Sequence, residues 1–280
     1  MISTAAASAV ALAAALMLAA APAPALAAGQ DSSAATAAGH LTAPQAAGFG
    51  KALERDLGAR GARVALVFRS GRPRKSMPKG MGYTHGALWI YRDITTTDGK
   101  RLQGYAVYNL YSGDGKALAG NRSHLVQDWP TDFMIGSAED DVAVILPTPE
   151  MQRRLLTLVD SPAYERLHIA SYSLIDNPFD GRHQNCTTFL LDLVGAAAWD
   201  TTDPAQIEAN LRAWFKPTVV HADILQRTFG PMIDPRISTD DQHGPLVTAG
   251  FESIAAFMRQ NRLSAATYAF KRPAFDQKPA

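Results

Sequence analysis

Cysteine is almost absent from this chain, since Cys186 is the single one among 280 residues. One thiol cannot form a disulfide within the chain. In a protein exported to an oxidising compartment, thiols usually pair or are avoided. A lone cysteine in such a protein indicates an intermolecular bridge, a buried inert residue or a reactive site.

Basic residues are missing from the start of the chain, and the first of them is Lys51. Residues 10–21 are instead rich in Ala, Leu and Met, but this run is shorter than the roughly 20 apolar residues that span a bilayer. Ala25-Leu26-Ala27 follows as a small-x-small cleavage pattern. We therefore predict a signal peptide over residues 1–28, atypical in its uncharged start, with an uncleaved anchor as the alternative.

A long apolar run is missing from the rest of the chain, so we expect a mature protein without a transmembrane segment, periplasmic or secreted. Residues 29–41 predict a flexible leader, which leaves 42–280 for a single domain. Lys and Arg number 27 against 26 Asp and Glu and are interspersed with them, so we expect no nucleic-acid partner. The one basic cluster, residues 69–79, lies among Gly and Pro and predicts a solvated loop, with an anion-binding lip as the alternative.

Motifs for metal and serine chemistry are also missing. His183-x-x-Cys186 has no further ligands at useful spacing, whereas a structural zinc site needs four. No Gly-x-Ser-x-Gly occurs, so a serine nucleophile on a strand-to-helix turn is not indicated. We therefore expect no metal and no cofactor.

What is present is a succession of helix and strand signals. Asp98-Gly99 between two aromatic and β-branched runs predicts a hairpin, and Thr148-Pro149 predicts a helix start. Residues 121–134 have a less regular pattern. The expected helices lie over 44–60, 149–159, from Cys186 onward and within 245–259, and the expected strands over 62–68, 83–92, 102–111 and 142–146.

Cys186 stands at the start of a predicted amphipathic helix, with Asn185 before it and Thr187 after it. A helix N-terminus carries about half a positive charge, which stabilises a thiolate and lowers the thiol pKa below its ordinary value of about 8.5. The same unpaired amides can bind the oxyanion that forms when a carbonyl is attacked. We predict that Cys186 is a nucleophile. The alternative, a small core residue, is disfavoured by its polar neighbours.

His85 lies at the head of a predicted buried strand, and the short residues Thr84 and Gly86 on either side would let another group approach its ring. An imidazole beside a thiol can take its proton. We predict that His85 is the general base. His183, only three residues before Cys186 but in a loop, is the alternative base.

A third group has to orient the imidazole and select its tautomer. If the hairpin turn has five residues, Thr95 pairs with Arg101, and Asn109 lies on the same face as His85. A two-residue turn would give that face to Tyr108 and its even-numbered neighbours instead. Asn109 is the chemically sensible orienting residue, as in papain-like enzymes.

The order of these motifs, histidine before cysteine, resembles a circularly permuted branch of the papain-like superfamily that includes lecithin retinol acyltransferase. The segments that carry this likeness are Thr84-His85-Gly86-Ala87 and Asn185-Cys186-Thr187-Thr188-Phe189. Residues 64–198 more closely resemble exported bacterial proteins known as domain of unknown function 2145. The matching motifs are Ala65-Leu66-Val67-Phe68-Arg69, Tyr83-Thr84-His85, Val107-Tyr108-Asn109-Leu110, Asn177-Pro178-Phe179 and Gln184-Asn185-Cys186, with a further likeness over 241–257.

The resemblance implies an α+β fold in which an antiparallel sheet is flanked by helices, circularly permuted papain-like, with a helical extension at the C-terminus. It also implies a site of Cys186 and His85 that works through an acyl-thioester. We therefore predict an exported cysteine hydrolase or acyltransferase acting on an amide or ester, with a cell-wall peptide or a lipid/acyl substrate. The alternatives are a non-catalytic periplasmic binding or assembly protein on the same scaffold, and a redox protein that uses the lone thiol.

Overall fold

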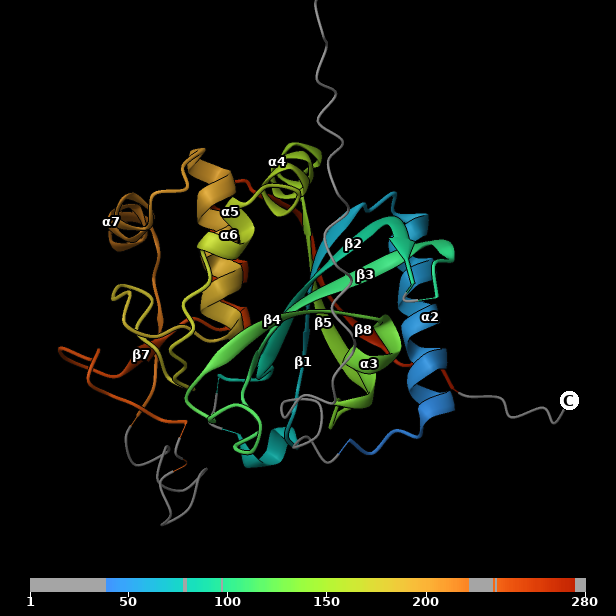
Figure 1. Cartoon of the computed structure of the whole chain (residues 1–280), viewed down its shortest axis with the longest axis horizontal. Helices are drawn as coiled ribbons and strands as arrows, with labels where there is room; N and C mark the ends of the chain where they lie inside the picture. The colour runs from blue at the N-terminus through green and yellow to red at the C-terminus, as the bar shows by residue number, and fades with distance from the viewer. Residues whose placement is uncertain (1–38, 78–79, 97, 222–233, 235, 275–280) are drawn as a thin grey trace, which may run out of the picture.

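Six antiparallel strands form one sheet at the centre of the protein, in the order β4-β3-β2-β1-β5-β8 (Figure 1). The computed structural model describes residues 39–77, 80–96, 98–221, 234 and 236–274. The predicted signal peptide and all but the last three residues of the predicted leader lie outside them. The strands of the sheet are β1 Val64–Arg69, β2 His85–Thr95, β3 Arg101–Ser112, β4 Ser123–Asp128, β5 Asp141–Pro147 and β8 Ser264–Lys271.

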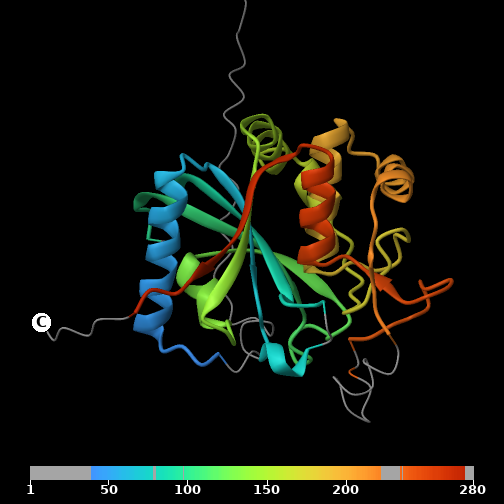
Figure 2. The ribbon, with the colours of Figure 1, turned by 180° about the vertical axis from the view of Figure 1, so that it is seen from behind.

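Helices cover both faces of this sheet, and Figures 1 and 2 show the two layers from opposite sides. Two helices, α2 and α3, pack on one face, whereas α4, α6 and α9 pack on the other with α5 and α7 beside them. The prediction of an α+β fold with an antiparallel sheet flanked by helices is confirmed. The helices are α2 Ala43–Ala59, α3 Pro130–Ile135, α4 Pro149–Val159, α5 Ala163–Arg166, α6 Cys186–Trp199, α7 Pro204–Trp214 and α9 Phe251–Gln260, and a short ribbon joins β6 Thr218–Val219 to β7 Val247–Thr248. Of the helices that the structure describes, none is long and apolar enough to cross a membrane.

Two hydrophobic cores form because side chains alternate between the faces of a strand. In β2, Leu88 and Ile90 pack against α4, α6 and α9, whereas Ala87 and Trp89 face α2 and α3. Burying one such large apolar side chain is worth roughly 1.5–3 kcal/mol. Each helical layer is therefore attached to the sheet by its own set of apolar contacts.

The β2–β3 hairpin positions the candidate site. Thr95 pairs with Arg101, which confirms the register that a five-residue turn predicts. At the far end of the hairpin, the pairing of the two strands stops at Leu88 and Tyr108. The first residues of β2, up to Ala87, are therefore paired with β1 but not with β3.

Three segments differ from the expectation. β4 forms within residues 121–134, which were expected to be less regular because polar residues interrupt the apolar pattern of a strand there. The C-terminal region, expected to be a helical extension, also returns β8 to the edge of the sheet, where half-buried and exposed residues alternate. The helix expected within 245–259 begins only at Phe251, because Val247–Thr248 pairs with β6.

Arg69 corrects the expectation of a solvated basic loop over residues 69–79. It is the last residue of β1 and only 1 % of it is exposed. Its guanidinium packs over the ring of Phe133 in α3, with Cζ 5.2 Å from the ring centroid. A Cβ on Gly136 would lie 1.2 Å from Nη1, so only a glycine leaves room for this side chain.

Candidate functional site

Cys186 is the first residue of α6, and Asn185 caps this helix. The side-chain oxygen of Asn185 accepts hydrogen bonds from the backbone N–H groups of Thr187 and Thr188, at 2.9 and 3.0 Å. Its amide donates in turn to the carbonyl of Leu174 at 3.3 Å. These bonds satisfy amides that a helix start would leave without partners, and they fix the direction in which the thiol leaves the helix.

The thiol lies against the beginning of β2. Sγ is 3.9 Å from the carbonyl oxygen of Thr84, and the backbone N–H of Gly86 donates to the sulfur. This close approach of α6 requires a glycine at position 86. A Cβ there would lie 2.7 Å from the side chains of Leu190 and Phe68. Gly86 therefore admits α6 to β2, and not, as was expected from the sequence, another group to the imidazole ring of His85.

His85 is held by a chain of hydrogen bonds. Its Nε2 lies 3.0 Å from Oδ1 of Asn109, and Nδ2 of Asn109 donates to the carboxylate of Asp128 at 3.1 Å. The hydroxyl of Tyr111 donates to the same carboxylate at 2.7 Å. Because Asp128 accepts from the amide nitrogen, Asn109 presents its oxygen to the ring, and Nε2 must carry the proton. The neutral imidazole then has its lone pair on Nδ1.

The ring and the thiol approach β2 from opposite faces of the sheet. His85 stacks on Tyr111 with ring centroids 5.1 Å apart and lies 5.7 Å from the ring of Phe133, on the face covered by α3. Cys186 belongs to the core beneath α6. Within the described part of the chain, no hydrogen bond joins its thiol to the imidazole of His85. Both groups lie against the first residues of β2, where β2 is no longer paired with β3.

Burial keeps both groups uncharged. It raises the pKa of the Cys186 thiol to about 11, against the opposing effects of the Gly86 amide and the Arg69 charge, and with a smaller contribution from Asp176 in the same direction as burial. Burial and, to a smaller extent, the nearby Arg69 together lower the pKa of His85 to about 3, against the opposing effect of the hydrogen bond to Asn109. A neutral thiol therefore lies near a neutral imidazole at pH 7. The low thiol pKa expected from the helix N-terminus does not occur, because desolvation outweighs the helix dipole.

A cavity of about 80 Å³ opens at Cys186. Apolar side chains dominate its wall, and Glu252 supplies the one carboxylate among the described residues that line it. Burial raises the pKa of Glu252, whose Oε1 accepts the backbone N–H of Gly82 at 3.1 Å. The apolar lining residues include Met77, Met81, Tyr172, Leu174, Ile175 and Val220.

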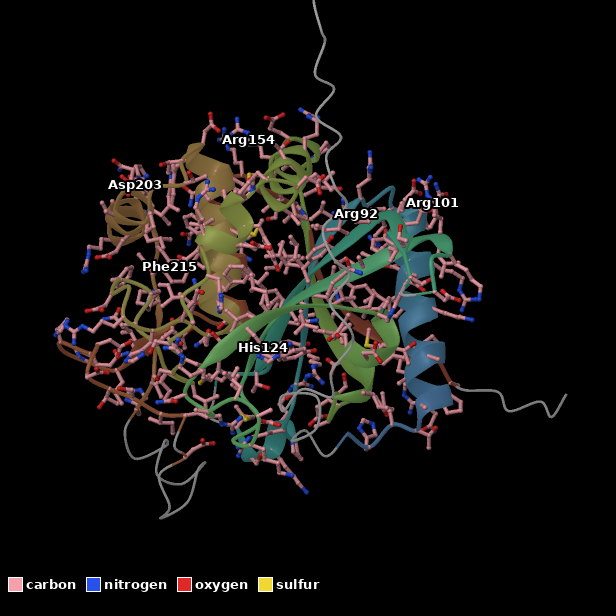
Figure 3. All side chains as sticks on the ribbon, in the orientation of Figure 1. Arg92, Arg101, His124, Arg154, Asp203 and Phe215 are labelled. Atoms are coloured by element: carbon pink, nitrogen blue, oxygen red, sulfur yellow. The ribbon has the colours of Figure 1, made fainter. Side chains whose placement is uncertain are left out.

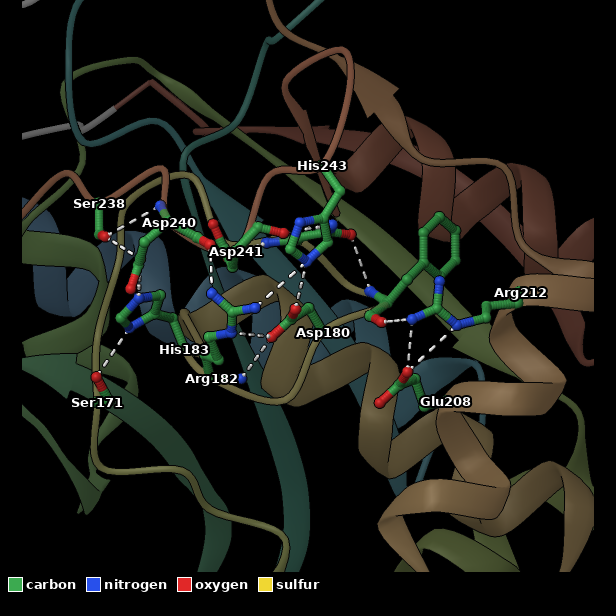
Figure 4. A network of polar contacts seen from close by, with 12 residues as sticks. Ser171, Asp180, Arg182, His183, Glu208, Arg212, Ser238, Asp240, Asp241 and His243 are labelled. Atoms are coloured by element: carbon green, nitrogen blue, oxygen red, sulfur yellow. Dashed lines mark hydrogen bonds and ion pairs between the residues drawn. The ribbon is translucent and has the colours of Figure 1, made fainter.

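His183, the alternative base, is fully engaged elsewhere. Figure 4 shows it within a surface network of ionic and polar side chains. Its Nδ1 lies 2.8 Å from Oγ of Ser171, and its Nε2 lies 2.6 Å from Oδ1 of Asp240. Neither nitrogen is left to take a proton from Cys186.

Sequence reasoning missed several buried polar groups around the site. Asp128 and Arg69 lie in segments that were expected to be irregular or solvated, so no pattern marked them. Asp176 is fully buried, and neither carboxyl oxygen makes a well-formed hydrogen bond. Burial raises its pKa well above the ordinary value, which keeps this carboxyl neutral near the thiol. The sequence shows no sign that Asp176 is buried near the thiol, because this depends on how residues 176–186 fold.

The described residues contain no group of three or more His, Cys, Asp or Glu side chains placed to hold a metal ion.

Comparison with known proteins identifies one family. No curated protein and no solved structure matches this chain. A family model described as an uncharacterized protein conserved in bacteria, DUF2145, matches residues 56–258. The matched residues include every strand of the central sheet except β8. They also include Cys186, His85 and the residues described above that contact them. The chain therefore belongs to the DUF2145 family.

Proposed function

We propose that this protein is an exported cysteine hydrolase or acyltransferase that acts on an amide or ester, with Cys186 as nucleophile, His85 as base and Asn109 as the residue that orients the base. The observation that carries this proposal is the Asp128–Asn109–His85 chain, which leaves the lone pair of the imidazole on Nδ1, in a residue next to Thr84, whose carbonyl the thiol contacts. We also propose that the fold is a circularly permuted papain-like scaffold, because the strand with the histidine precedes the helix with the cysteine in the chain.

The reaction begins when Sγ of Cys186 forms a bond to the carbonyl carbon and its proton passes to Nδ1 of His85. The backbone amides at the start of α6 stabilise the oxygen that becomes negative. Collapse of this intermediate breaks the bond to the amine or alcohol, which leaves with the proton from Nδ1. Water then cleaves the thioester in a hydrolase, and an acceptor hydroxyl or amine does so in a transferase.

This sequence requires Nδ1 and Sγ to come within hydrogen-bond reach. The unpaired end of β2 and β3 offers the place for that contact, since no ladder hydrogen bonds have to break there. Catalytic hydrogen bonds are often long or absent before substrate binds and shorten in the complex. Because both groups are neutral at rest, proton transfer and attack on the carbonyl occur together.

The lining of the cavity favours one of the two substrate classes. Met77, Met81, Leu174 and Ile175 would contact an acyl chain, whereas a cell-wall peptide would need polar partners for its amides. Glu252 is placed to accept a hydrogen bond from the leaving group or acceptor. We therefore favour an ester or amide of an apolar acyl group.

The test is acylation of Cys186 by p-nitrophenyl octanoate, followed by intact-protein mass spectrometry. We expect a mass increase of one octanoyl group, lost in Cys186→Ala and formed at least 100-fold more slowly in His85→Ala. His183→Ala is the matched control and should acylate at the normal rate. Equal rates in His85→Ala and the unchanged protein would contradict the proposal.

A second candidate is a non-catalytic periplasmic binding or assembly protein. A thiol with its pKa raised to about 11 and without a hydrogen bond to His85 favours this reading. In that case Cys186 should show no more reactivity toward the ester than its exposure allows, and neither histidine variant should alter it.

A further inference from the structure

A hollow that shares no lining residue with the cavity at Cys186 lies on the face of the sheet that α2 covers. It is enclosed by the C-terminal half of α2, the segment that leads into β1, and the turn end of the β2–β3 hairpin. Its volume is about 710 Å³, against about 80 Å³ at the thiol. Sites for small molecules commonly measure about 300–1,000 Å³.

Two tyrosines form the apolar wall of this hollow. Tyr91 is 40 % exposed, which makes it one of the few large apolar side chains open to water among the described residues. Its ring lies edge-on to Tyr105, with centroids 5.4 Å apart. The hydroxyl of Tyr105 donates to the carbonyl of Ala62 at 2.5 Å. The ring of Tyr105 is therefore held in place, and the exposed ring of Tyr91 is open to contact with a ligand.

Three cationic side chains line the same hollow: Lys51, Arg55 and Arg63. All three are exposed, and none forms an ion pair with another residue that the structure describes. Arginines nearby behave differently. Arg92 is paired with Asp160 and Arg101 with Asp93, and both are labelled in Figure 3 at the hairpin end of the sheet. Positive charge is thus left uncompensated around this hollow.

Glu54 is the one carboxylate among the described lining residues. It is half-buried, and the backbone N–H of Tyr105 donates to it. Burial raises its pKa, with Lys51 opposing that effect. The carboxylate of Glu54 therefore binds the backbone of β3 and forms no ion pair with Arg55 or Arg63.

Backbone donors add to this surface. β4 pairs only with Val107–Ser112 of β3, so residues 101–106 have no strand on their outer side. Gln103 presents this open edge to the hollow, because backbone N–H groups alternate in direction along a strand and that of Tyr105 points outward to Glu54. Unpaired backbone N–H groups are strong hydrogen-bond donors and favour an anionic partner.

We propose that this hollow is a second ligand site, separate from Cys186, that binds a small anionic amphiphile. The ligand has one carboxylate, sulfonate or phosphate attached to an aromatic or alkyl body. Arg55 and Arg63 bind its anionic group, since guanidinium forks match such oxygens, and Tyr91 covers its apolar body. Nothing in this assignment depends on the reaction at the thiol.

The test uses two fluorescent probes of similar apolar body and different charge, 8-anilinonaphthalene-1-sulfonate and the neutral N-phenyl-1-naphthylamine. We expect the sulfonate to bind the full chain at one site. The double variant Arg55→Gln/Arg63→Gln should weaken it at least tenfold while the neutral probe changes less than twofold. Tyr91→Ser should weaken both probes.

The matched control is Arg92→Gln/Arg101→Gln, which removes two ion-paired arginines at the same end of the sheet and should change sulfonate binding less than twofold. Cys186→Ala should also leave it unchanged. Competition by sodium decanoate and by 1-naphthoate separates an alkyl from an aromatic ligand body, and displacement by either supports the site. The proposal is overturned if the sulfonate does not bind, or if both double variants weaken it equally.

Discussion

The two faces of the sheet carry hollows of opposite character. At the α6 face, the cavity beside Cys186 is small and apolar, and its ionisable groups are buried and held neutral. At the α2 face, the hollow beside Tyr91 is about nine times as large and is bordered by exposed, charged side chains. The first suits chemistry, because desolvation strengthens every electrostatic interaction inside it. The second suits reversible binding, since its charges remain hydrated until a ligand arrives.

The largest expected effect concerns the orienting residue of the thiol side. Asn109→Ala removes the acceptor of Nε2, so the imidazole loses its fixed tautomer, and we expect acylation of Cys186 to slow by about 100-fold. Tyr108→Phe is the control, because Tyr108 belongs to the same strand but faces the other way, toward Arg92. Stopped-flow release of p-nitrophenol measures both. A similar loss in the two variants would indicate damage to β3 and not to the site.

The next effect tests how tightly each face is packed. Gly86→Ala places a Cβ 2.7 Å from Leu190 and Phe68, so we expect it to lower the free energy of unfolding by about 2 kcal/mol. Gly104→Ala is the matched strand variant at the open hollow, where the only neighbour of the new Cβ is Oε1 of Glu54 at 3.8 Å. Urea denaturation should show Gly104→Ala within about 0.5 kcal/mol of the unchanged protein. Equal losses would remove the contrast between the faces.

The smallest effect is a dependence of stability on pH. Burial raises the pKa of Asp192, in the cysteine helix α6, to about 7, and Gln184 opposes this by donating to it at 2.7 Å. The folded protein therefore holds a proton that the unfolded chain releases near pH 4, so this group costs stability as pH rises from about 4 to 7. Asp192→Asn should be unchanged at pH 4 and more stable by about 1 kcal/mol at pH 8.

Glu54 supplies the comparison for that experiment on the other face. Its pKa is raised in the same direction but it is half-exposed, so Glu54→Gln should gain less between the same two pH values. Thermal unfolding at pH 4 and pH 8 measures both variants. If Glu54→Gln gained as much stability between pH 4 and pH 8 as Asp192→Asn, carboxyl groups on the two faces would be equally desolvated.

Local signals in the sequence predicted the elements that they govern. Asp98-Gly99 predicted the hairpin, Thr148-Pro149 the start of α4, and the parity of the turn placed Asn109 on the face of His85. Each of these depends on residues close together in the chain.

Long-range pairing decided the rest of the site. Nothing near His85 or Cys186 in the sequence indicates that they reach β2 from opposite faces, because that follows from the layers that α3 and α6 occupy. β8 was missed for a similar reason: its half-buried alternation acquires meaning only when β5 lies beside it. The low thiol pKa was expected from the helix start alone, and the actual direction follows from the surrounding core.

The packing of Arg69 over Phe133, in the space that Gly136 leaves, has a consequence for the conditions under which the site can work. The guanidinium of Arg69 lies near His85 and adds to the lowering of the pKa of that imidazole, while burial lowers the pKa of Arg69 itself. Because burial lowers the pKa of His85 to about 3 and raises that of Cys186 to about 11, neither group changes its protonation near neutral pH. The site therefore keeps the same protonation state when the acidity of the surrounding solution changes around neutral pH.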